Sequence, residues 1–219
     1  LALAKQVVAE AHKQGIKVVM DYVMNHTHQN SSTYKNNKSW FWNLYKGSGQ
    51  CICGSNTCGW NGSDGERCWF MPYLPDFNFS NSTARAFSVN NAIKWGKDLG
   101  LDGFRLDAVK HINMTWLTDL RTKVKTAFAG KNFYMVGETY TGDKGTIKKY
   151  VNPNTMLDGQ FDFPMRYELV RVILMRQGGF KDLDSFLNQN DTYYGYGSVM
   201  GTFIGNHDLP RVIHYAEDK

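Results

Sequence analysis

The sequence lacks several features that would point to common classes of protein. A membrane span needs about eighteen consecutive apolar residues, and no apolar run in the sequence approaches that length. Neither glycine-rich phosphate-binding motif, G-x-G-x-x-G or G-x-x-x-x-G-K-S/T, occurs, which argues against a doubly wound nucleotide-binding sheet. The net charge of +5 is spread along the chain without a basic block. No nucleic-acid or membrane partner is therefore expected.

An initiating methionine and a leader peptide are also lacking at the start of the sequence. The first residues, LALAKQVVAEAHKQG, resemble the interior of a domain, so we expect the chain to begin within one. With 219 residues, of which 42% are hydrophobic and 14% aromatic, the chain can still bury a sizeable core.

Cysteine is confined to one short region. Cys51, Cys53, Cys58 and Cys68 lie in a stretch rich in Gly and Asn, and their even number predicts two disulfides that staple a loop with little core of its own. Three pairings are possible. A zinc site is the alternative, although the spacing differs from paired C-x-x-C knuckles. Disulfides indicate an oxidising compartment, so we expect a secreted protein.

Helical and strand patterns alternate along most of the chain. Apolar residues at helical spacing precede Gly15, and a buried strand pattern, IKVVMDYVMNH, follows it. Further helices are predicted at about 83–99, with Ser82 or Thr83 as the cap, and at about 115–128, 165–176 and 182–187. Further strands are predicted at DGFRLDAV, FYMVGE, GQFDFP and MGTFIGN. Residues 27 to about 81 show no sustained period. This alternation predicts an α/β fold with a parallel sheet, either a barrel or a doubly wound sheet.

Acidic and imidazole side chains lie at the ends of the predicted strands. Barrel enzymes have their catalytic groups at the carboxyl ends of several strands, so this placement favours the barrel over the doubly wound sheet. The carboxylates are Asp107, Glu138 and Asp208, with Arg105, His26 and His207 around them. Cleaving a sugar acetal requires one protonated carboxyl and one ionised partner. Arg105 is expected to keep Asp107 ionised, and an apolar setting to raise the pKa of Glu138. The alternatives are a turn cap at Asp208, a surface ion pair at Glu138 and a structural Arg105–Asp107 salt bridge.

Five stretches resemble motifs of the α-amylase family of glycoside hydrolases, in the family's order. They are DYVMNH (21–26), LPDFN (74–78), GFRLDAVKH (103–111), GE (137–138) and FIGNHD (203–208). The resemblance implies a partial (β/α)8 TIM barrel, about strands 3–7, with an irregular, disulfide-containing inserted domain after the third strand. It divides the chain into 1–26 (barrel), 27–81 (insert) and 82–219 (barrel). Because strands are missing, we expect this piece alone to aggregate or fold poorly.

The resemblance also implies roles for individual residues. Asp107 would be the nucleophile, Glu138 the acid/base and Asp208 the transition-state stabiliser of a retaining enzyme. Substrate contacts would come from His26, Arg105, His207 and the pair Lys110 and His111 on the leaving-group side. A structural Ca²⁺ would be held by Asn25, Asp76 and the main-chain carbonyl of His111.

The function implied is an endo-acting α-amylase that cleaves α-1,4 bonds of starch or glycogen and is a monomer at full length. An α-glucosidase or glucan transferase with the same carboxylates, and a non-catalytic barrel used for binding, are the alternatives. Trp69, Phe70 and Tyr73 would either stack on sugars or form the core of the insert.

Overall fold

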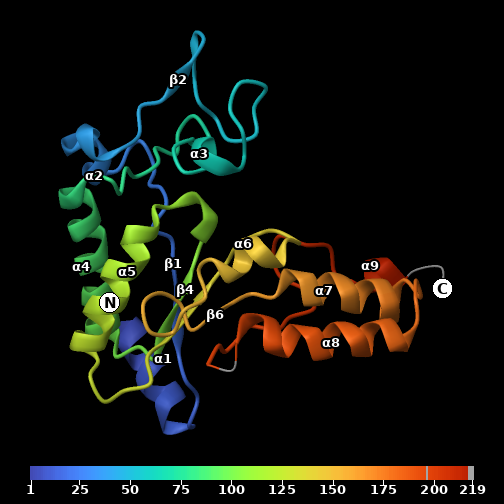
Figure 1. Cartoon of the computed structure of the whole chain (residues 1–219). Helices are drawn as coiled ribbons and strands as arrows, with labels where there is room; N and C mark the ends of the chain where they lie inside the picture. The colour runs from blue at the N-terminus through green and yellow to red at the C-terminus, as the bar shows by residue number, and fades with distance from the viewer. Residues whose placement is uncertain (196, 217–219) are drawn as a thin grey trace. The chain divides into compact units, whose positions relative to one another are not determined.

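The computed structural model describes residues 1–195 and 197–216. Its contacts divide the chain into two compact units, one of residues Leu1–Glu138 and one that begins at Thr139. Figure 1 shows the elements of both units along the chain. Within the described ranges, no helix combines the length and the apolar character needed to cross a membrane.

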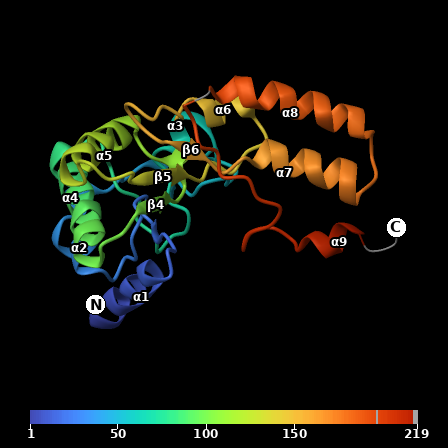
Figure 2. The ribbon, with the colours of Figure 1, turned by 90° about the horizontal axis from the view of Figure 1, so that it is seen from below.

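The first unit is built on a parallel sheet. Its strands β1 (Val19–Tyr22), β4 (Gly103–Leu106) and β5 (Tyr134–Gly137) are neighbours in that order. Its longer helices are α1 (Ala2–Lys13), α4 (Ser82–Leu99) and α5 (Met114–Ala127). Figures 1 and 2 both show α4 and α5 side by side against the sheet. The predicted alternation of helices and parallel strands is therefore present.

The core of this unit lies between β4 and the helices. β4 is buried at every position, as expected of a parallel strand with both faces covered. Phe104 and Leu106 are fully buried, and Trp116 on α5 is fully buried with them. The polar exception in β4 is Arg105, which is 9% exposed. A buried guanidinium needs partners of opposite charge, so its surroundings decide what this strand end can do.

In this unit the helices α1, α4 and α5 end near the glycines that were predicted to stop them, but one predicted N-cap is wrong. Gly100 ends α4 in the left-handed conformation, with φ at 73°, where glycine lacks the steric penalty of a Cβ. The predicted N-cap, Ser82 or Thr83, is wrong. Asn81 caps α4, because its side-chain oxygen accepts hydrogen bonds from the N–H groups of Thr83 and Ala84 at 2.9 and 3.2 Å.

The segment between β1 and α4 holds only short elements, as its lack of period predicts. They are α2 (Ser32–Asn36), the 3-10 helix η1 (Lys38–Trp40), the hairpin of β2 (Tyr45–Lys46) and β3 (Gly49–Gln50), and α3 (Gly62–Gly65). Both predicted disulfides are present, and they pair Cys51 with Cys58 and Cys53 with Cys68. Since few apolar residues are available in this loop, the half-cystines form its buried centre, together with Leu44.

The second unit is mainly helical. Its elements are α6 (Lys144–Lys148), β6 (Gly159–Gln160), α7 (Phe163–Leu169), a π-helical turn η3 (Val170–Leu174), α8 (Phe180–Tyr194) and α9 (Val212–Ala216). Figures 1 and 2 show α7 and α8 side by side. The helix predicted at 182–187 is longer than expected, and α6 and α9 were not predicted. Asp162 caps α7 by accepting a hydrogen bond from the N–H of Met165 at 3.0 Å.

The strand predicted over 200–206 is only partly formed. The N–H groups of Val199 and Gly201 donate to the carbonyls of Asp158 and Gln160 at 2.7 and 2.9 Å, and the N–H of Asp162 donates back to Gly201 at 3.0 Å. Residues 202–206 form no strand. A strand persists only where a neighbour accepts its hydrogen bonds, and β6 itself is two residues long.

Candidate active site at the strand ends

Arg105 joins three carboxylates at the carboxyl end of the sheet. Its Nη1 donates hydrogen bonds to Asp21 Oδ1 at 2.7 Å and to Asp107 Oδ1 at 2.6 Å, and its Nη2 donates to Glu138 Oε2. The planar fork of donors allows one guanidinium to hold several carboxylates. The Arg105–Asp107 contact expected from their two-residue spacing is present, and two of the three predicted catalytic carboxylates therefore meet on one side chain.

The backbone places Asp107 and Glu138 next to each other. Each follows the last residue of its strand, and the register pairs Leu106 with Gly137, so the two acids leave adjacent strands at the same level. The N–H of Glu138 donates to the carbonyl of Leu106 at 2.8 Å, and the N–H of Val109 donates to the carbonyl of Glu138 at 2.9 Å. These hydrogen bonds continue the backbone pairing beyond the ends of β4 and β5 and fix the backbone positions of Asp107 and Glu138.

The carboxylates differ in burial. The side chain of Glu138 is 9% exposed, that of Asp107 is 22% exposed and that of Asp21 is 56% exposed. Burial disfavours the charge of Arg105, but the hydrogen bond to Asp21 and the charges of Glu138 and Asp107 outweigh it and raise the pKa of the guanidinium. Arg105 is thus a permanent cation in contact with three carboxylates.

His26 lies beside these carboxylates. Burial lowers the pKa of its imidazole, and the negative charge of Asp107 opposes that shift. The Nδ1 atom of His26 is buried without a hydrogen-bond partner. Its ring lies 5.3 Å from the ring of Phe70. A neutral imidazole with an unpartnered nitrogen next to the acids is suited to bind a hydroxyl group.

Asn25 and Asp76, two of the three predicted calcium ligands, are in contact. The Nδ2 of Asn25 donates to Asp76 Oδ2 at 2.6 Å, and both side chains are fully buried. The Oδ1 atom of each has no hydrogen-bond partner among the residues that the structure describes. Burial raises the pKa of Asp76 well above its ordinary value, and the bond from Asn25 offsets this only in part. Two buried acceptor oxygens without donors, one of them on a carboxylate, fit a hard cation such as Ca²⁺.

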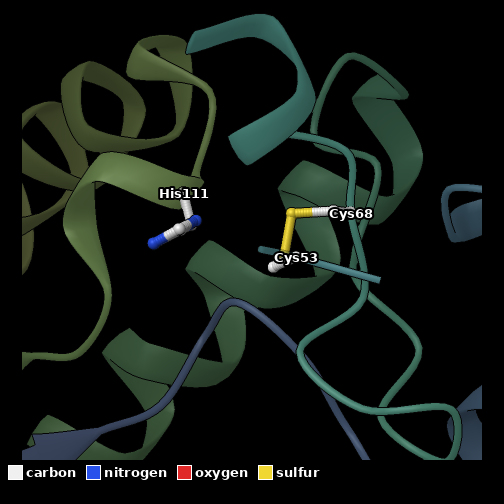
Figure 3. Close-up of side chains that lie close together, drawn as sticks. All are labelled: Cys53, Cys68 and His111. Atoms are coloured by element: carbon white, nitrogen blue, oxygen red, sulfur yellow. A yellow bond between two sulfur atoms is a disulfide. The ribbon is translucent and has the colours of Figure 1, made fainter. Parts of the chain in front are cut away.

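His111, the third predicted ligand, is held by the insert. Its Nδ1 lies 2.8 Å from the carbonyl of Gly65, and burial lowers the pKa of the imidazole to about 4. Figure 3 shows the ring beside the disulfide of Cys53 and Cys68. The ring of His111 is therefore fixed by the stapled loop, whereas the calcium role of its carbonyl stays a prediction.

Cys53, Cys68 and His111 form a group with metal-binding atoms within 4.8 Å of one another. Both sulfurs are bonded to each other, so neither is available as the thiolate that zinc requires. The zinc alternative to the disulfides is therefore not supported by this arrangement.

The aromatic residues of the insert divide between core and surface. Trp69 is 8% exposed, and its indole N–H donates to the carbonyl of Trp42 at 2.8 Å, which is typical of a core residue. Phe70 lies against His26 and His111, and Tyr73 is 43% exposed. Lys110 lies at the surface of this cluster, where its Nζ donates to Asn61 Oδ1 at 3.0 Å, and burial lowers its pKa.

His207 and Asp208 belong to the second unit. Their side chains are 71% and 50% exposed, and they form an ion pair of 3.2 Å between His207 Nε2 and Asp208 Oδ2. The N–H of Asp208 donates to Asn206 Oδ1 at 3.0 Å, and Arg166 Nε donates to the nearby carbonyl of Ile204 at 3.3 Å. The convergence of Asp208 with Asp107 and Glu138 stays a prediction.

Sequence reasoning missed three contributors to this region. Asp21 was not predicted to contact Arg105; the register of β1 and β4 pairs these two residues. Gly65 and Trp60 lie in the irregular loop and contact His111. The sequence signal for them was weak, because an irregular loop has no period from which contacts can be inferred.

A family model described as the catalytic domain of α-amylase matches residues 2–219. The chain belongs to the α-amylase family of glycoside hydrolases. The predicted resemblance is thus confirmed, and so is the predicted fold class, a partial (β/α)8 barrel with a disulfide-containing insert. The parallel strands and the two disulfides of the described residues agree with it.

Comparison with individual members of the α-amylase family shows what share of each relative's length this chain covers. The chain is 31% identical over 222 residues to a beta/alpha-amylase of Paenibacillus polymyxa, covering 98% of this chain and 17% of the relative. It is 30% identical over 225 residues to a cyclomaltodextrin glucanotransferase of Niallia circulans, covering 94% of this chain and 30% of the relative. The crystal structure of an Anoxybacillus α-amylase matches with a TM-score of 0.81 at 26% identity, covering 99% of this chain and 45% of that one. The chain thus spans less than half the length of each.

Proposed function

We propose that the full-length protein carrying this chain is a retaining, endo-acting α-amylase that cleaves α-1,4 bonds of starch-type glucans. The observation that supports this most directly is the joint hold of Arg105 on Asp107 and Glu138 at adjacent strand ends. Two carboxylates placed side by side are the machinery of glycoside hydrolysis. The membership of the α-amylase family supports the substrate class.

The proposed mechanism has two steps. Asp107 attacks the anomeric carbon while Glu138 donates its proton to the leaving glycosidic oxygen, which gives a glucosyl ester on Asp107 and a shortened glucan. Glu138, now ionised, takes a proton from water, and the oxygen of that water attacks the anomeric carbon and releases Asp107. Two inversions leave the α configuration unchanged. Asp208, His26 and His207 bind the sugar undergoing cleavage.

Arg105 contacts both proposed catalytic acids at once. In the proposed mechanism Asp107 attacks as a carboxylate, whereas Glu138 carries a proton in the first step and is ionised in the second. The substrate would therefore need to weaken the Arg105–Glu138 contact for the acid role.

Calcium is part of the proposal. Asn25 and Asp76 would supply oxygen ligands, with the His111 carbonyl as the third from this chain, and the ion would join the insert to the loop after β4. The unpartnered Oδ1 atoms of Asn25 and Asp76 support this assignment. Secretion is proposed together with it, since two disulfides are expected in an oxidising compartment.

The test uses the full-length protein and soluble starch. Random internal cuts that release α-anomeric oligosaccharides are expected, and Glu138→Gln is expected to lower kcat about 10²- to 10⁴-fold. Asp119→Asn, an exposed acid on α5, is the matched control and should retain full activity. Initial release of β-anomers, or full activity of Glu138→Gln, would contradict the proposed mechanism.

A glucan transferase is the second candidate, because 94% of this chain aligns with a relative that is a cyclomaltodextrin glucanotransferase. The same glucosyl ester would then pass to a sugar hydroxyl instead of water. Elongated or cyclic products from starch would favour this candidate, and glucose as the sole product would favour an α-glucosidase.

Calcium is tested separately by its effect on stability. A chelator should lower the thermal midpoint of the unchanged protein, and added Ca²⁺ should restore it, because a ligand bound only to the folded state stabilises that state. Asp76→Asn should abolish this response, and Asp119→Asn should preserve it. An unchanged chelator response in Asp76→Asn would exclude Asp76 as a ligand.

A further inference from the structure

A pocket in the second unit lies outside the residues proposed for catalysis. It is lined by residues at the start of α7, on α8 and after α8, and its volume is about 370 Å³. Asp162, Asn190 and Tyr194 line it and are buried, with exposed fractions of 0, 4 and 7%, whereas Thr202 lines it and is exposed. The buried polar groups therefore form the deep part of the pocket, and Thr202 lies at its mouth. A cavity of this size with a few buried polar groups is typical of small-molecule sites.

Asp162 and Asn190 hold each other in place within this pocket. Asn190 Nδ2 donates to Asp162 Oδ2 at 2.6 Å, and Asp162 Oδ1 accepts from the N–H of Met165 at 3.0 Å. The Oδ1 atom of Asn190 is buried and has no hydrogen-bond partner among the described residues. Burying an acceptor without a donor costs free energy. This oxygen therefore points to an occupant that donates a hydrogen bond.

Tyr194 adds a second unpartnered group to the same pocket. Its hydroxyl is buried and has no hydrogen-bond partner within the described ranges. Burial raises the pKa of the phenol, and the charge of Asp162 adds to this shift, so the hydroxyl keeps its proton at neutral pH and can donate it. An occupant that satisfies both residues must accept a hydrogen bond from Tyr194 and donate one to Asn190.

This pair of requirements argues against ions. A metal ion accepts no hydrogen bond from Tyr194, and Asp162 already interacts with the positive charge of Lys144. The half-buried Met165 and Met200 add thioethers, which hard cations disfavour as ligands. An anion would face the Asp162 carboxylate. A hydroxyl group, in contrast, both donates and accepts.

The size of the pocket argues for more than a single water. One water molecule takes up roughly 30 Å³ of liquid, so the pocket has room for several. A ring that carries several hydroxyl groups could replace these waters together while its C–H groups pack on the methionines. Water can satisfy the same polar groups, so it is the alternative that an experiment has to exclude.

We propose that this pocket binds one pyranose ring of a neutral sugar. Two neighbouring ring hydroxyls would donate to Asn190 Oδ1 and to the remaining lone pair of Asp162 Oδ2, and one of them would accept from Tyr194. The C–H face of the ring would pack on Met165 and Met200. A free monosaccharide and the terminal ring of an oligosaccharide present these same hydroxyls. None of the pocket residues has a role in the proposed catalytic mechanism, so this inference stands apart from it.

The test is a glucose titration of the full-length protein, followed by saturation-transfer NMR on the sugar. Tyr194→Phe removes only the hydroxyl and should weaken binding at this site about three- to tenfold, as the loss of one hydrogen bond predicts. Its thermal midpoint should match that of the unchanged protein, because the hydroxyl has no described partner to lose. Tyr193→Phe is the matched control. Tyr193 precedes Tyr194 on α8, is 36% exposed and does not line the pocket, so this variant should keep the affinity of the unchanged protein.

Thr202→Trp tests the same pocket from its mouth without touching the buried groups. It should abolish the glucose signal of this site and leave only that of glucose bound elsewhere. Equal glucose binding by the unchanged protein, Tyr194→Phe and Thr202→Trp would overturn the inference and leave the pocket to water. The inference would also fail if Na⁺ or Ca²⁺, but not glucose, raised the thermal midpoint of the unchanged protein and had no such effect on Tyr194→Phe.

Two further measurements separate the possible sources of the sugar and the two proposals. Maltoheptaose is titrated into Glu138→Gln, which should not cleave it. Competition with glucose at this site would identify the terminal ring of an oligosaccharide as a ligand, and lack of competition would identify a free monosaccharide. If the unchanged protein failed to cleave starch, the proposed function would be contradicted, whereas weaker glucose binding by Tyr194→Phe would still support the pocket.

Discussion

Removing the charge of Arg105 should destabilise the protein far more than removing its most exposed partner. Arg105 is 9% exposed and Glu138 is 7% exposed, so Arg105→Met would take the guanidinium away from a buried carboxylate that it contacts. Removing one partner of a buried ion pair costs about 3–5 kcal/mol. Asp21 contacts the same guanidinium, but its side chain is 56% exposed. Solvent screens such a pair, so Asp21→Asn should cost only about 0.2–1 kcal/mol.

The assay is urea unfolding of the full-length protein in buffer that contains Ca²⁺. The double variant Arg105→Met/Glu138→Gln should be more stable than Arg105→Met alone, because the neutral amide removes the buried carboxylate charge that has lost the guanidinium. This recovery separates charge burial from lost packing of the arginine stem. The reasoning would be refuted if Arg105→Met and Asp21→Asn unfolded within about 1 kcal/mol of each other, or if Glu138→Gln gave no recovery in the Arg105→Met background.

Three further variants test the backbone and the burial of single groups. Gly103→Ala should lower the free energy of unfolding in urea by about 2–3 kcal/mol or more, because the added Cβ would lie 2.2 Å from the carbonyl oxygen of Tyr134. The control is Gly49→Ala, whose Cβ would meet no atom within 4 Å, and it should change the free energy of unfolding by less than about 0.5 kcal/mol. Ala108→Gly should raise stability by up to about 1 kcal/mol, since Ala108 has φ at 49° and the left-handed region costs a residue with a Cβ roughly 1–2 kcal/mol; a loss of stability would show that the strain is absent. Burial raises the pKa of Tyr22, and hydrogen bonds lower it only in part, so the unfolded chain loses this proton first and stability should fall as pH rises from 10 through the folded pKa. The free energy of unfolding of Tyr22→Phe, measured against pH, should lack this fall, and an identical alkaline slope would contradict the assignment.

The sequence was sufficient for features that depend on local patterns. Apolar periodicity and glycine punctuation predicted α1, α4 and α5, and the two-residue spacing of Arg105 and Asp107 predicted their contact. The cap of α4 was wrong because Asn81, Ser82 and Thr83 are all good capping residues and only the backbone path selects one. A local pattern therefore predicts that a helix begins, while its exact first residue depends on the surrounding structure.

Features that depend on strand register or on an irregular loop were not accessible in this way. Asp21 became a partner of Arg105 because β1 and β4 pair these two positions across the sheet. The disulfide pairing and the contact of Trp60 with His111 depend on a loop without a repeating pattern. The predicted strand over 200–206 depended on neighbours that pair with it only as far as Gly201. Two expectations stay predictions. One is that this piece aggregates when isolated, and the other is the pair of domain boundaries at 26 and 81.

The proposed catalytic acids and the insert both depend on the strand end that carries Arg105. β4 supplies Arg105 from inside the sheet, and the residues that follow it supply Asp107, Lys110 and His111 within six positions. The guanidinium organises the carboxylates on one side, and the stapled loop holds the His111 ring on the other. Because Asp107 and His111 are only four positions apart, a change in the loop that shifts His111 should also shift Asp107. On this reasoning the disulfides act on catalysis through the geometry of the turn after β4, although none of the cysteines is a candidate for contact with the sugar.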